Sequence, residues 1–498
     1  MKKLVLFVIL LIVCQNLLSA QYSGGQGIAT DPYKIATTED LIELSNTWGD
    51  WDKYFIQTAD ISFDADETQV DWDGSGSVGG DDERGFYPIG NSTVNFTGSY
   101  DGENHKIDNL YINRSSRYGV GLLGLINNAI ISNLGVTNVD ITGKDNVGGL
   151  VGYNSAITNA TYSTVSSPIS NCFSTGSVSG FGNYVGGLVG YNSATTNTVY
   201  SSSSSPISNC YSTGSVSGSD YVGGLVGYNS SSASYYSSSS SISNCYSTGS
   251  VSGSGNNVGG LVGYNSSEYS NRSSISNCYS TGDVARSSGS DTAFGGFCGW
   301  NYNSAIECCY SVGNVIYEDA ANPIDKGFLG YGSGTFTSNF FDSTASNQST
   351  DGPGAATPKT TSEMKTQSTF TDWDFTDVWQ IVGGDGANYP TLREIDIVTG
   401  VEDNNLSLEL PLEFTLEQNY PNPFNPSTVI NYHLSEHSKV ELKVYDILSR
   451  EIAVLVNKEQ AAGNYTVNFN ASSLSSGVYF YQIKTGKYLE TRKMLLLR

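Results

Sequence analysis

The densest set of side chains that could do chemistry in this sequence is acidic. It lies in the segment DISFDADETQVDWDGSGSVGGDDER, which begins at residue 60. Clustered aspartates can supply the several carboxylate oxygens that calcium favours, although this spacing does not match an EF-hand loop. A solvated acidic loop is the alternative interpretation. The candidate calcium ligands are Asp64, Asp66, Asp71, Asp73, Asp81 and Asp82.

A row of aromatic residues is the second candidate, because one ring recurs at the same place in successive repeats of the chain. Each ring directly follows a cysteine, and we expect the cysteine to point inward and the ring outward. Outward rings can offer flat faces to sugars, or can simply stack on one another for stability. The five candidate ligand-binding residues are Phe173, Tyr211, Tyr246, Tyr279 and Tyr310.

Tyr111 and Phe341 are expected to extend this row into less regular repeats. A second aromatic row follows a glycine motif in each repeat. Its members are Tyr153, Tyr191, Tyr228, Tyr264, Trp300 and Tyr331.

Groups for acid–base catalysis are scarce in the centre of the chain. From Asn146 to Ser267 the only charged residue is Asp220. Glycosidic cleavage needs two placed carboxylates, or a base with a cation that neutralises charge. We therefore predict no catalytic residue. An enzyme with its site near the acidic loop is the alternative.

A repeat must position these residues. VGGLVGYNS occurs at residues 147, 185, 222 and 258, and ISNC followed by an aromatic residue occurs at 169, 207, 242 and 275. The spacing between successive copies of each motif is typical of solenoids. The motifs are rich in β-branched, aromatic and glycine residues and have no helical periodicity. We expect coils of roughly 25 patterned residues, each with a flexible Ser-rich loop inserted at one corner. The clear repeats span 107–342.

In-register stacking should place equivalent residues in ladders along the solenoid axis. An isoleucine row runs from Ile169 to Ile306, and Asn171 and its equivalents fit a tight left-handed turn. The cysteine slot should be a buried apolar one, because we align Leu110, Leu134 and Phe340 with it. The slot comprises Cys172, Cys210, Cys245, Cys278 and Cys309.

Composition divides the chain. Residues 1–20 have a basic head, a short apolar run and a small residue at the end, which is typical of a secretory signal peptide. Residues 21–411 carry 40 acidic and 13 basic side chains, whereas 412–498 carry 8 and 9. We expect a passenger over 21–395, a linker over 396–411 and a second domain over 412–498. A passenger this acidic should not bind nucleic acid by charge, and no later stretch is apolar enough to cross a membrane.

The glycine motifs resemble the GLUG motif of large bacterial surface proteins, and the lead-in sequences Asp31-Pro32-Tyr33 and Tyr87-Pro88-Ile89-Gly90 resemble those that precede such repeats. The resemblance covers about residues 24–395. It implies an all-β fold, a right-handed parallel β-helix, with a closing segment from Trp373 to Leu392.

Residues 412–498 are similar to the type A C-terminal sorting domain of the type IX secretion system. The matching motifs are Asn419-Tyr420-Pro421-Asn422-Pro423-Phe424-Asn425-Pro426, Val444-Tyr445-Asp446, Leu474-Ser475-Ser476-Gly477-Val478-Tyr479 and Lys493-Met494. The resemblance implies a small immunoglobulin-like β-sandwich whose partner is the type IX machinery.

These observations predict a non-enzymatic secreted or outer-membrane surface protein that reaches its destination through the periplasm and serves in adhesion or glycan binding. A polysaccharide-active enzyme and a purely structural spacer are the alternatives. The expected function requires no cofactor, and calcium is the one ion that the sequence suggests. Surface or extracellular polysaccharide is the expected ligand class.

Overall fold

The computed structural model describes residues 22–64, 72, 84–233, 237–268, 273–288, 293–318, 320–393, 415–416, 419, 424–434, 438–447, 450–460, 463–471, 474–485 and 488–497. The chain forms two compact units, and the division between them follows Gly400. The expected signal peptide at 1–20 and the expected linker at 396–411 lie outside the described residues.

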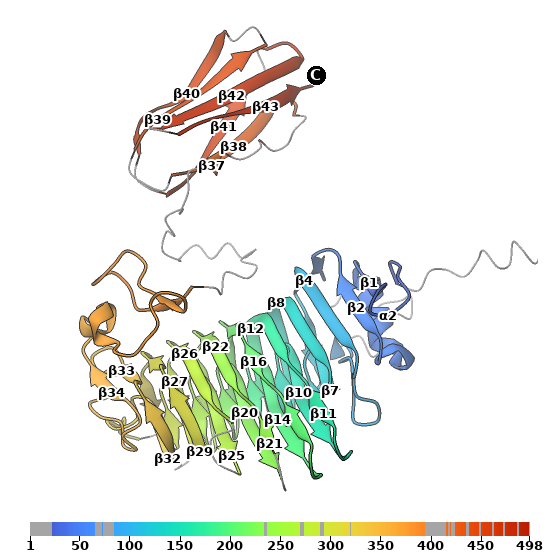
Figure 1. The fold of residues 1–498 in the computed structure, drawn as a ribbon, viewed down its shortest axis with the longest axis vertical. Coiled ribbons are helices and arrows are strands. Elements are labelled where there is room, and N and C mark those ends of the chain that lie inside the picture. The colour runs from blue at the N-terminus through green and yellow to red at the C-terminus, as the bar shows by residue number, and fades with distance from the viewer. Residues whose placement is uncertain are drawn as a thin grey trace, which may run out of the picture. The chain divides into compact units, whose positions relative to one another are not determined.

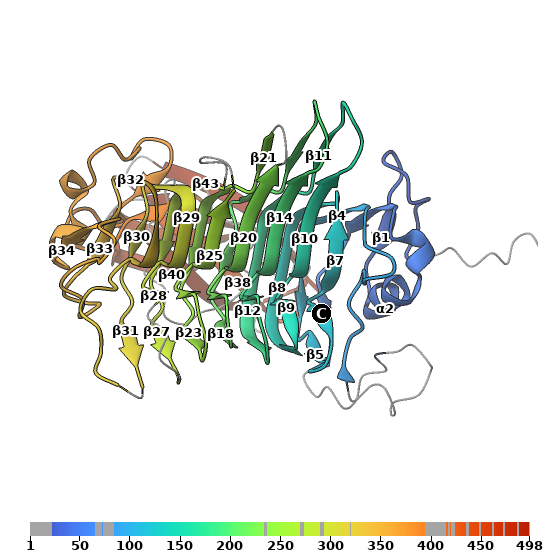
Figure 2. The ribbon, with the colours of Figure 1, turned by 90° about the horizontal axis from the view of Figure 1, so that it is seen from below.

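The first unit is a parallel β-solenoid in which each coil adds strands beside those of the coil before it (Figures 1 and 2). One wall, here called the GYN wall, consists of the strands that carry the Gly-Tyr-Asn motif and their equivalents. They are β7 (Leu123–Asn127), β10 (Val151–Thr158), β14 (Val189–Thr196), β20 (Val226–Ala233), β25 (Val262–Ser267), β29 (Cys298–Glu307) and β32 (Leu329–Thr337).

A second wall, the SNC wall, consists of the strands that carry the Ser-Asn-Cys motif, together with their continuations. It begins with β4 (Ser99–Asp108), β5 (Tyr111–Asn113), β8 (Ile130–Gly143) and β12 (Ile169–Gly180). The later strands are β16 (Ile207–Ser208), β17 (Tyr211–Ser212), β18 (Ser215–Gly218), β22 (Ile242–Ser247), β23 (Val251–Gly253), β26 (Ile275–Ser280), β27 (Val284–Arg286), β30 (Tyr310–Ser311), β31 (Val315–Tyr317), β33 (Phe340–Asp342) and β34 (Thr357–Lys359).

Short strands join the two walls in a parallel sheet of their own. Four of them, β9, β13, β19 and β24, carry the Val-Gly pair that opens the glycine motif. A Cβ on this glycine would clash with backbone; at Gly186 it would lie 2.1 Å from Val189 O. The strands are β6 (Tyr118–Val120), β9 (Asp145–Gly148), β13 (Val185–Gly186), β19 (Val222–Gly223), β24 (Val258–Gly259) and β28 (Phe294–Gly295).

The N-terminal end of the solenoid carries the helix α2 (Thr38–Asn46). Thr37 caps it and forms a capping box with Asp40, which satisfies backbone N–H groups at the helix start. Leu41 and Leu44 are buried in the main core. Nearby lie β1 (Tyr33–Ile35), η1 (Trp48–Asp50), β2 (Tyr54–Gln57) and β3 (Ile61–Ser62).

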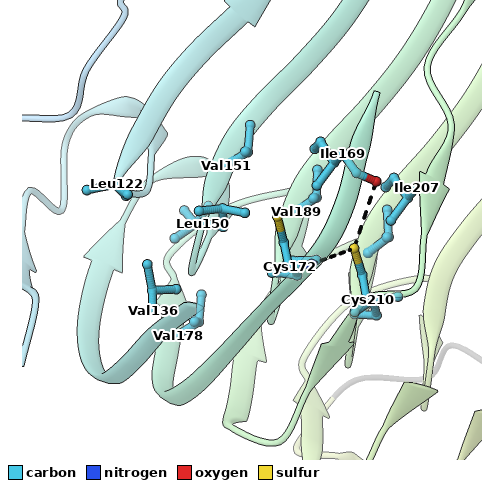
Figure 3. Close-up of a cluster of buried hydrophobic side chains, with 14 of the residues drawn as sticks. Leu122, Val136, Leu150, Val151, Ile169, Cys172, Val178, Val189, Ile207 and Cys210 are labelled. Carbon is cyan, nitrogen blue, oxygen red and sulfur yellow. Dashed lines mark hydrogen bonds between the residues drawn. The ribbon is translucent and has the colours of Figure 1, made fainter. Parts of the chain in front are cut away.

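The predicted ladders of the core are confirmed. Ile169 pairs with Ile207, and the isoleucine row continues in register through Ile242, Ile275 and Ile306. Figure 3 shows Cys172 and Cys210 among aliphatic side chains of several coils, with Cys210 Sγ bridging to Cys172 N and Ile169 O. All five cysteines of the slot are buried in the core and are free thiols.

The turn before each cysteine is also as predicted. Asn171, Asn209, Asn244 and Asn277 have φ angles of 55°, 52°, 51° and 52°. Asparagine tolerates this left-handed conformation better than most residues do. In the coils of Asn171, Asn209 and Asn244, each amide donates to the asparagine one coil earlier at 2.8, 3.1 and 3.2 Å.

Two of the aligned residues were assigned wrongly at the ends of the repeat. Leu134 pairs with Cys172 as expected, but His105 lies opposite Leu134, so Leu110 is buried in another slot. Phe340 pairs with Tyr310 and therefore belongs to the aromatic row. The expected places of Phe341 and Tyr111 in that row are wrong as well, because Phe341 pairs with Ser311 and Tyr111 pairs with Asp140. Register is harder to read where the repeat diverges, because neighbouring copies no longer match.

The Ser-rich insertions were expected to be flexible loops, and three of them are instead ordered strands. β11 (Thr164–Ser166), β15 (Ser202–Ser204) and β21 (Ser237–Ser239) form a parallel sheet that projects from the edge of the GYN wall (Figure 2). Hydroxyl groups link adjacent strands, as between Ser166 and Ser204 at 2.9 Å. The insertions repeat with the coils, so each provides the backbone template for the next.

A buried row of asparagines closes the base of each insertion. These residues follow the tyrosine of the Gly-Tyr-Asn motif and are fully buried. Each of the first four donates one amide hydrogen to the asparagine of the next coil at 2.8 Å. The second hydrogen goes to a serine carbonyl at the far end of its own insertion. The row is Asn154, Asn192, Asn229, Asn265 and Asn301.

Because of this arrangement, the geometry of a coil does not depend on the length of its insertion. Asn154 bonds to the carbonyl 13 residues later, whereas Asn265 bonds 8 residues later and Asn301 only 3 residues later. Both amide donors are satisfied in every case, as buried polar groups require. Insertions of different length therefore leave the stack undisturbed.

The second unit is a small β-sandwich of two antiparallel sheets. Its core contains Leu442, Tyr481 and Met494. Asn419, within the first sorting motif, is buried: its backbone N–H donates to the Tyr481 hydroxyl at 2.7 Å, and its side chain donates to Thr428 at 2.9 Å. One sheet is β37 (Thr415–Leu416), β38 (Ser427–Leu434) and β41 (Gly463–Asn470); the other is β39 (Ser438–Asp446), β40 (Glu451–Gln460), β42 (Gly477–Thr485) and β43 (Tyr488–Leu496).

Candidate ligand-binding surfaces

The first aromatic row lies outside the coil core on the SNC wall, as its alternation with the cysteines predicts. Phe173, Tyr211, Tyr246, Tyr279 and Tyr310 are in register from coil to coil. Consecutive ring centroids lie 4.8, 4.8, 4.8 and 5.1 Å apart, with interplanar angles of 7°, 0°, 5° and 9°. The rings therefore turn their faces to one another.

A segment near the end of the first unit covers the later rings of this row. It contains η4 (Glu363–Lys365), η5 (Gln367–Thr369), β35 (Trp379–Gln380) and β36 (Thr391–Leu392). Trp379 packs against Tyr279 and Tyr310 with centroids 6.2 and 6.1 Å apart.

Hydrogen bonds hold this segment in place. The Tyr310 hydroxyl donates to Pro390 O at 2.7 Å, and the Tyr389 hydroxyl donates to the buried Asp342 carboxylate at 2.7 Å. Burial raises the pKa of Tyr310 well above its ordinary value. The hydroxyl therefore stays protonated and can donate at neutral pH.

The expected exposure of the first row is wrong. Phe173, Tyr211, Tyr279 and Tyr310 are only 1%, 6%, 7% and 1% exposed, and Tyr246 is half-buried. A ring is wider across its face than the spacing between coils, so rings on consecutive coils must stack rather than lie flat. The row consequently offers no open face to a sugar.

The second aromatic row lies on the outer face of the GYN wall, and its members are half-buried except for the exposed Tyr331. Tyr153, Tyr191, Tyr228 and Tyr264 are in register, with centroids 4.9, 4.7 and 4.9 Å apart. Burial raises the pKa of Tyr153, Tyr191 and Tyr264, so these hydroxyls stay neutral at physiological pH. The row thus presents hydroxyls and ring edges without charge.

Two tyrosines beside this row were not anticipated. Tyr184 and Tyr221 have positive φ angles of 65° and 57°, and their rings stack 5.0 Å apart. Each meets the row edge-on, as Tyr184 does with Tyr191 at 76°. Their place before the Val-Gly pair matches Asn146 and Asn257, which also have positive φ angles. That alignment was the available signal.

Only the first of the six candidate calcium ligands lies among the described residues. Asp64 is exposed, whereas Asp66, Asp71, Asp73, Asp81 and Asp82 lie outside the described residues. Within the part of the chain that the structure describes, no group of three or more His, Cys, Asp or Glu side chains could hold a metal ion. Calcium binding by this loop remains a prediction.

Asp220, the one acid in the central repeats, has a structural partner. Its carboxylate accepts hydrogen bonds from the backbone and the side-chain amide of Asn256, one coil later. Asp145 does the same for Asn183 N at 2.7 Å. These carboxylates fix turns between coils.

Residues 418–497 match the family described as the secretion system C-terminal sorting domain. The match covers the β-sandwich, including the motifs around Asn419 and Met494. The protein carries a type IX sorting domain. It is therefore a substrate of the type IX secretion machinery and is secreted or attached to the cell surface. Among the described residues, no helix is long and apolar enough to cross a membrane.

The solenoid of this type IX substrate contains GLUG motifs, which match at residues 218–252 and 254–285. The chain is 34% identical over 168 residues to Halomucin of Haloquadratum walsbyi. The match covers 33% of this chain and 2% of that protein. It is 30% identical over 126 residues to the "Putative Gly-rich membrane protein" of Evansella cellulosilytica, covering 25% of this chain and 13% of that protein. The chain thus matches only a small part of either relative.

A crystal structure of "a putative immunoglobulin A1 protease" from Bacteroides ovatus is similar with a TM-score of 0.42 and 21% identity. The similarity covers 75% of this chain and 95% of that one.

Proposed function

We propose that this type IX substrate is a non-enzymatic surface or secreted binding protein, an adhesin whose solenoid engages glycans. The observation that carries the proposal is the outer face of the GYN wall. It combines half-buried tyrosines with side-chain hydroxyls on a continuous sheet, as in Tyr191 and Thr195 of β14. Aromatic carbon and hydroxyl groups together suit the apolar and polar surfaces of a sugar.

The charge of this face favours a neutral ligand. The strands β10, β14, β20 and β25 contain no charged residue. A binding site for an anionic polymer would instead be expected to present Lys or Arg. Rigid backbone ladders also reduce the ordering that binding would otherwise require.

Acidic side chains between these coils already have partners, which argues against catalysis. Asp220 and Asp145 are already bonded to the next coil, and glycosidic cleavage needs two carboxylates free to act on one bond. The alternatives are a polysaccharide-active enzyme and a structural spacer.

One assay separates these functions. The mature chain is incubated with insoluble cellulose, chitin and mannan, and bound protein and released reducing ends are measured in the same tubes. Depletion without released ends, unchanged between low and high salt, is expected, because screening acts on charges alone. Released reducing ends would identify an enzyme. If the protein binds no neutral or anionic polysaccharide, a purely structural spacer is the remaining function.

A further inference from the structure

The second aromatic row changes its geometry in the last coils. From Tyr191 to Tyr264 the rings are nearly parallel, with interplanar angles of 16° and 11°. Trp300 is then tilted 52° from Tyr264 at 5.9 Å, and Tyr331 meets Trp300 edge-on at 77°. Rings that leave the parallel stack cover less of one another's faces.

A substitution in the repeat adds a further ring at the same place. Ser155, Ser193, Ser230 and Ser266 occupy one slot in successive coils, and Tyr302 occupies it in β29. Ser155 is 1% exposed, whereas Tyr302 is 49% exposed. Tyr331, on the last strand of the wall, is 58% exposed. Large exposed rings concentrate at this end of the GYN wall.

The polar surroundings suit an uncharged ligand. β25 and β32 contain no charged residue, and β29 contains only Glu307, its last residue. Lys326 approaches the site, but its ammonium donates to Gly330 O at 2.9 Å and lies 3.9 Å from the Asp325 carboxylate. Ser333 lies opposite Tyr302 and supplies a hydroxyl.

We infer that Tyr264, Trp300, Tyr302 and Tyr331 form the subsite that holds a pyranose ring of a neutral polysaccharide. This inference rests on the proposed function and places it at the C-terminal end of the GYN wall. A sugar stacks on a ring face rather than on an edge, and here consecutive rings turn furthest from parallel packing, by 52° and 77°, compared with 42° between Tyr153 and Tyr191. Tyr302 and Tyr331 provide exposed ring surface beside Trp300.

The repeat supplies substitutions that should preserve the fold. Trp300→Tyr and Tyr302→Ser restore the residues that earlier coils have in these slots. The double variant should keep the far-UV circular dichroism and melting temperature of the wild type. Its affinity for the polysaccharide that the wild type binds should fall about tenfold or more, since it loses an indole face and a phenol face. Tyr162→Ser is the matched control, because Tyr162 is 78% exposed but lies on an insertion.

The outcomes distinguish the inference from the function on which it rests. If the wild type binds cellulose, chitin or mannan and the double variant binds equally well, the subsite lies elsewhere and the inference is overturned. If the Tyr162 control weakens binding as much as the double variant does, the inference is also overturned. If the wild type binds none of the probes, the proposed function itself fails. A dimer in sedimentation equilibrium that the double variant dissociates would assign the surface to a second copy instead.

Discussion

Replacing Asn229 with alanine would test the buried asparagine row at its centre. Asn229 Nδ2 donates to Asn265 Oδ1 at 2.8 Å and to Ser240 O at 2.6 Å. Its own Oδ1 accepts from Asn192 Nδ2 at 2.8 Å. The side chain is fully buried, so the alanine variant removes three hydrogen bonds in one coil.

The expected cost follows from the groups left behind. A buried donor or acceptor that loses its partner costs about 1–3 kcal/mol, and three such groups give about 3–9 kcal/mol. The base of the β21 insertion also loses its tie to Asn229, so the segment that contains β21 should open first.

The assay is urea unfolding of the mature chain, with limited proteolysis under native conditions as a local readout. Asn209→Gly is the matched control in the neighbouring row. Asn209 is only half-buried, its φ of 52° suits glycine, and water can replace its side-chain bonds to Asn171 and Asn244. The control should therefore lose about 1 kcal/mol.

An equal loss of unfolding free energy in the two variants would refute the reasoning, because it would show that burial does not make the hydrogen bonds of the Asn229 row more stabilising. Unchanged proteolysis of the insertion would refute the separate claim that the row closes the insertion at its base.

Four further predictions follow from the core, the pH dependence, the acidic loop and the sorting domain. Cys245→Asp should unfold its coil, whereas Cys245→Ala should cost about 1–2 kcal/mol; equal melting temperatures would contradict the buried slot. Burial raises the pKa of Cys172, Cys210, Cys245 and Cys278, so the unfolded chain releases these protons first. The free energy of unfolding should be unaffected below the ordinary thiol pKa and should fall as pH rises above it. The slope of this fall should correspond to one proton less in Cys245→Ala, and a free energy of unfolding that stays constant up to pH 10 would contradict this. Chelation should lower the melting temperature if residues 60–82 bind calcium, and equal melts in chelator and millimolar calcium would leave a solvated loop. Deleting residues 412–498 should retain the passenger in the periplasm of a type IX host, and normal extracellular yield would contradict the sorting role.

Periodicity made the central register readable from the sequence. In a solenoid the neighbours of each residue along the axis are its own copies, so one alignment of the repeats predicts many contacts. The Ile, Cys and left-handed Asn rows were predicted in this way. Leu110, Tyr111, Phe340 and Phe341 were placed in the wrong rows, because flanking copies diverge there and the pairing depends on local bulges and turns.

The buried asparagines were harder to recognise. In the motif Gly-Tyr-Asn-Ser, asparagine resembles a turn residue, and its amide can be buried only because a neighbouring coil and a serine carbonyl satisfy it. Neither partner is adjacent in sequence. The strands in the Ser-rich insertions also depend on stacking between coils, since no single insertion contains a pattern that indicates a strand.

The repeat, the alternation of inward cysteine and outward ring, and the sorting domain could be predicted from the sequence, because local motifs specify each of them. Which rings a ligand can reach depends on the tertiary structure. Stacking at the coil spacing uses up the faces of the first row, and the segment containing Trp379, 100 residues after Tyr279, folds back over it. Accessibility depends on contacts between coils and on this distant segment, and a pattern within one repeat contains neither.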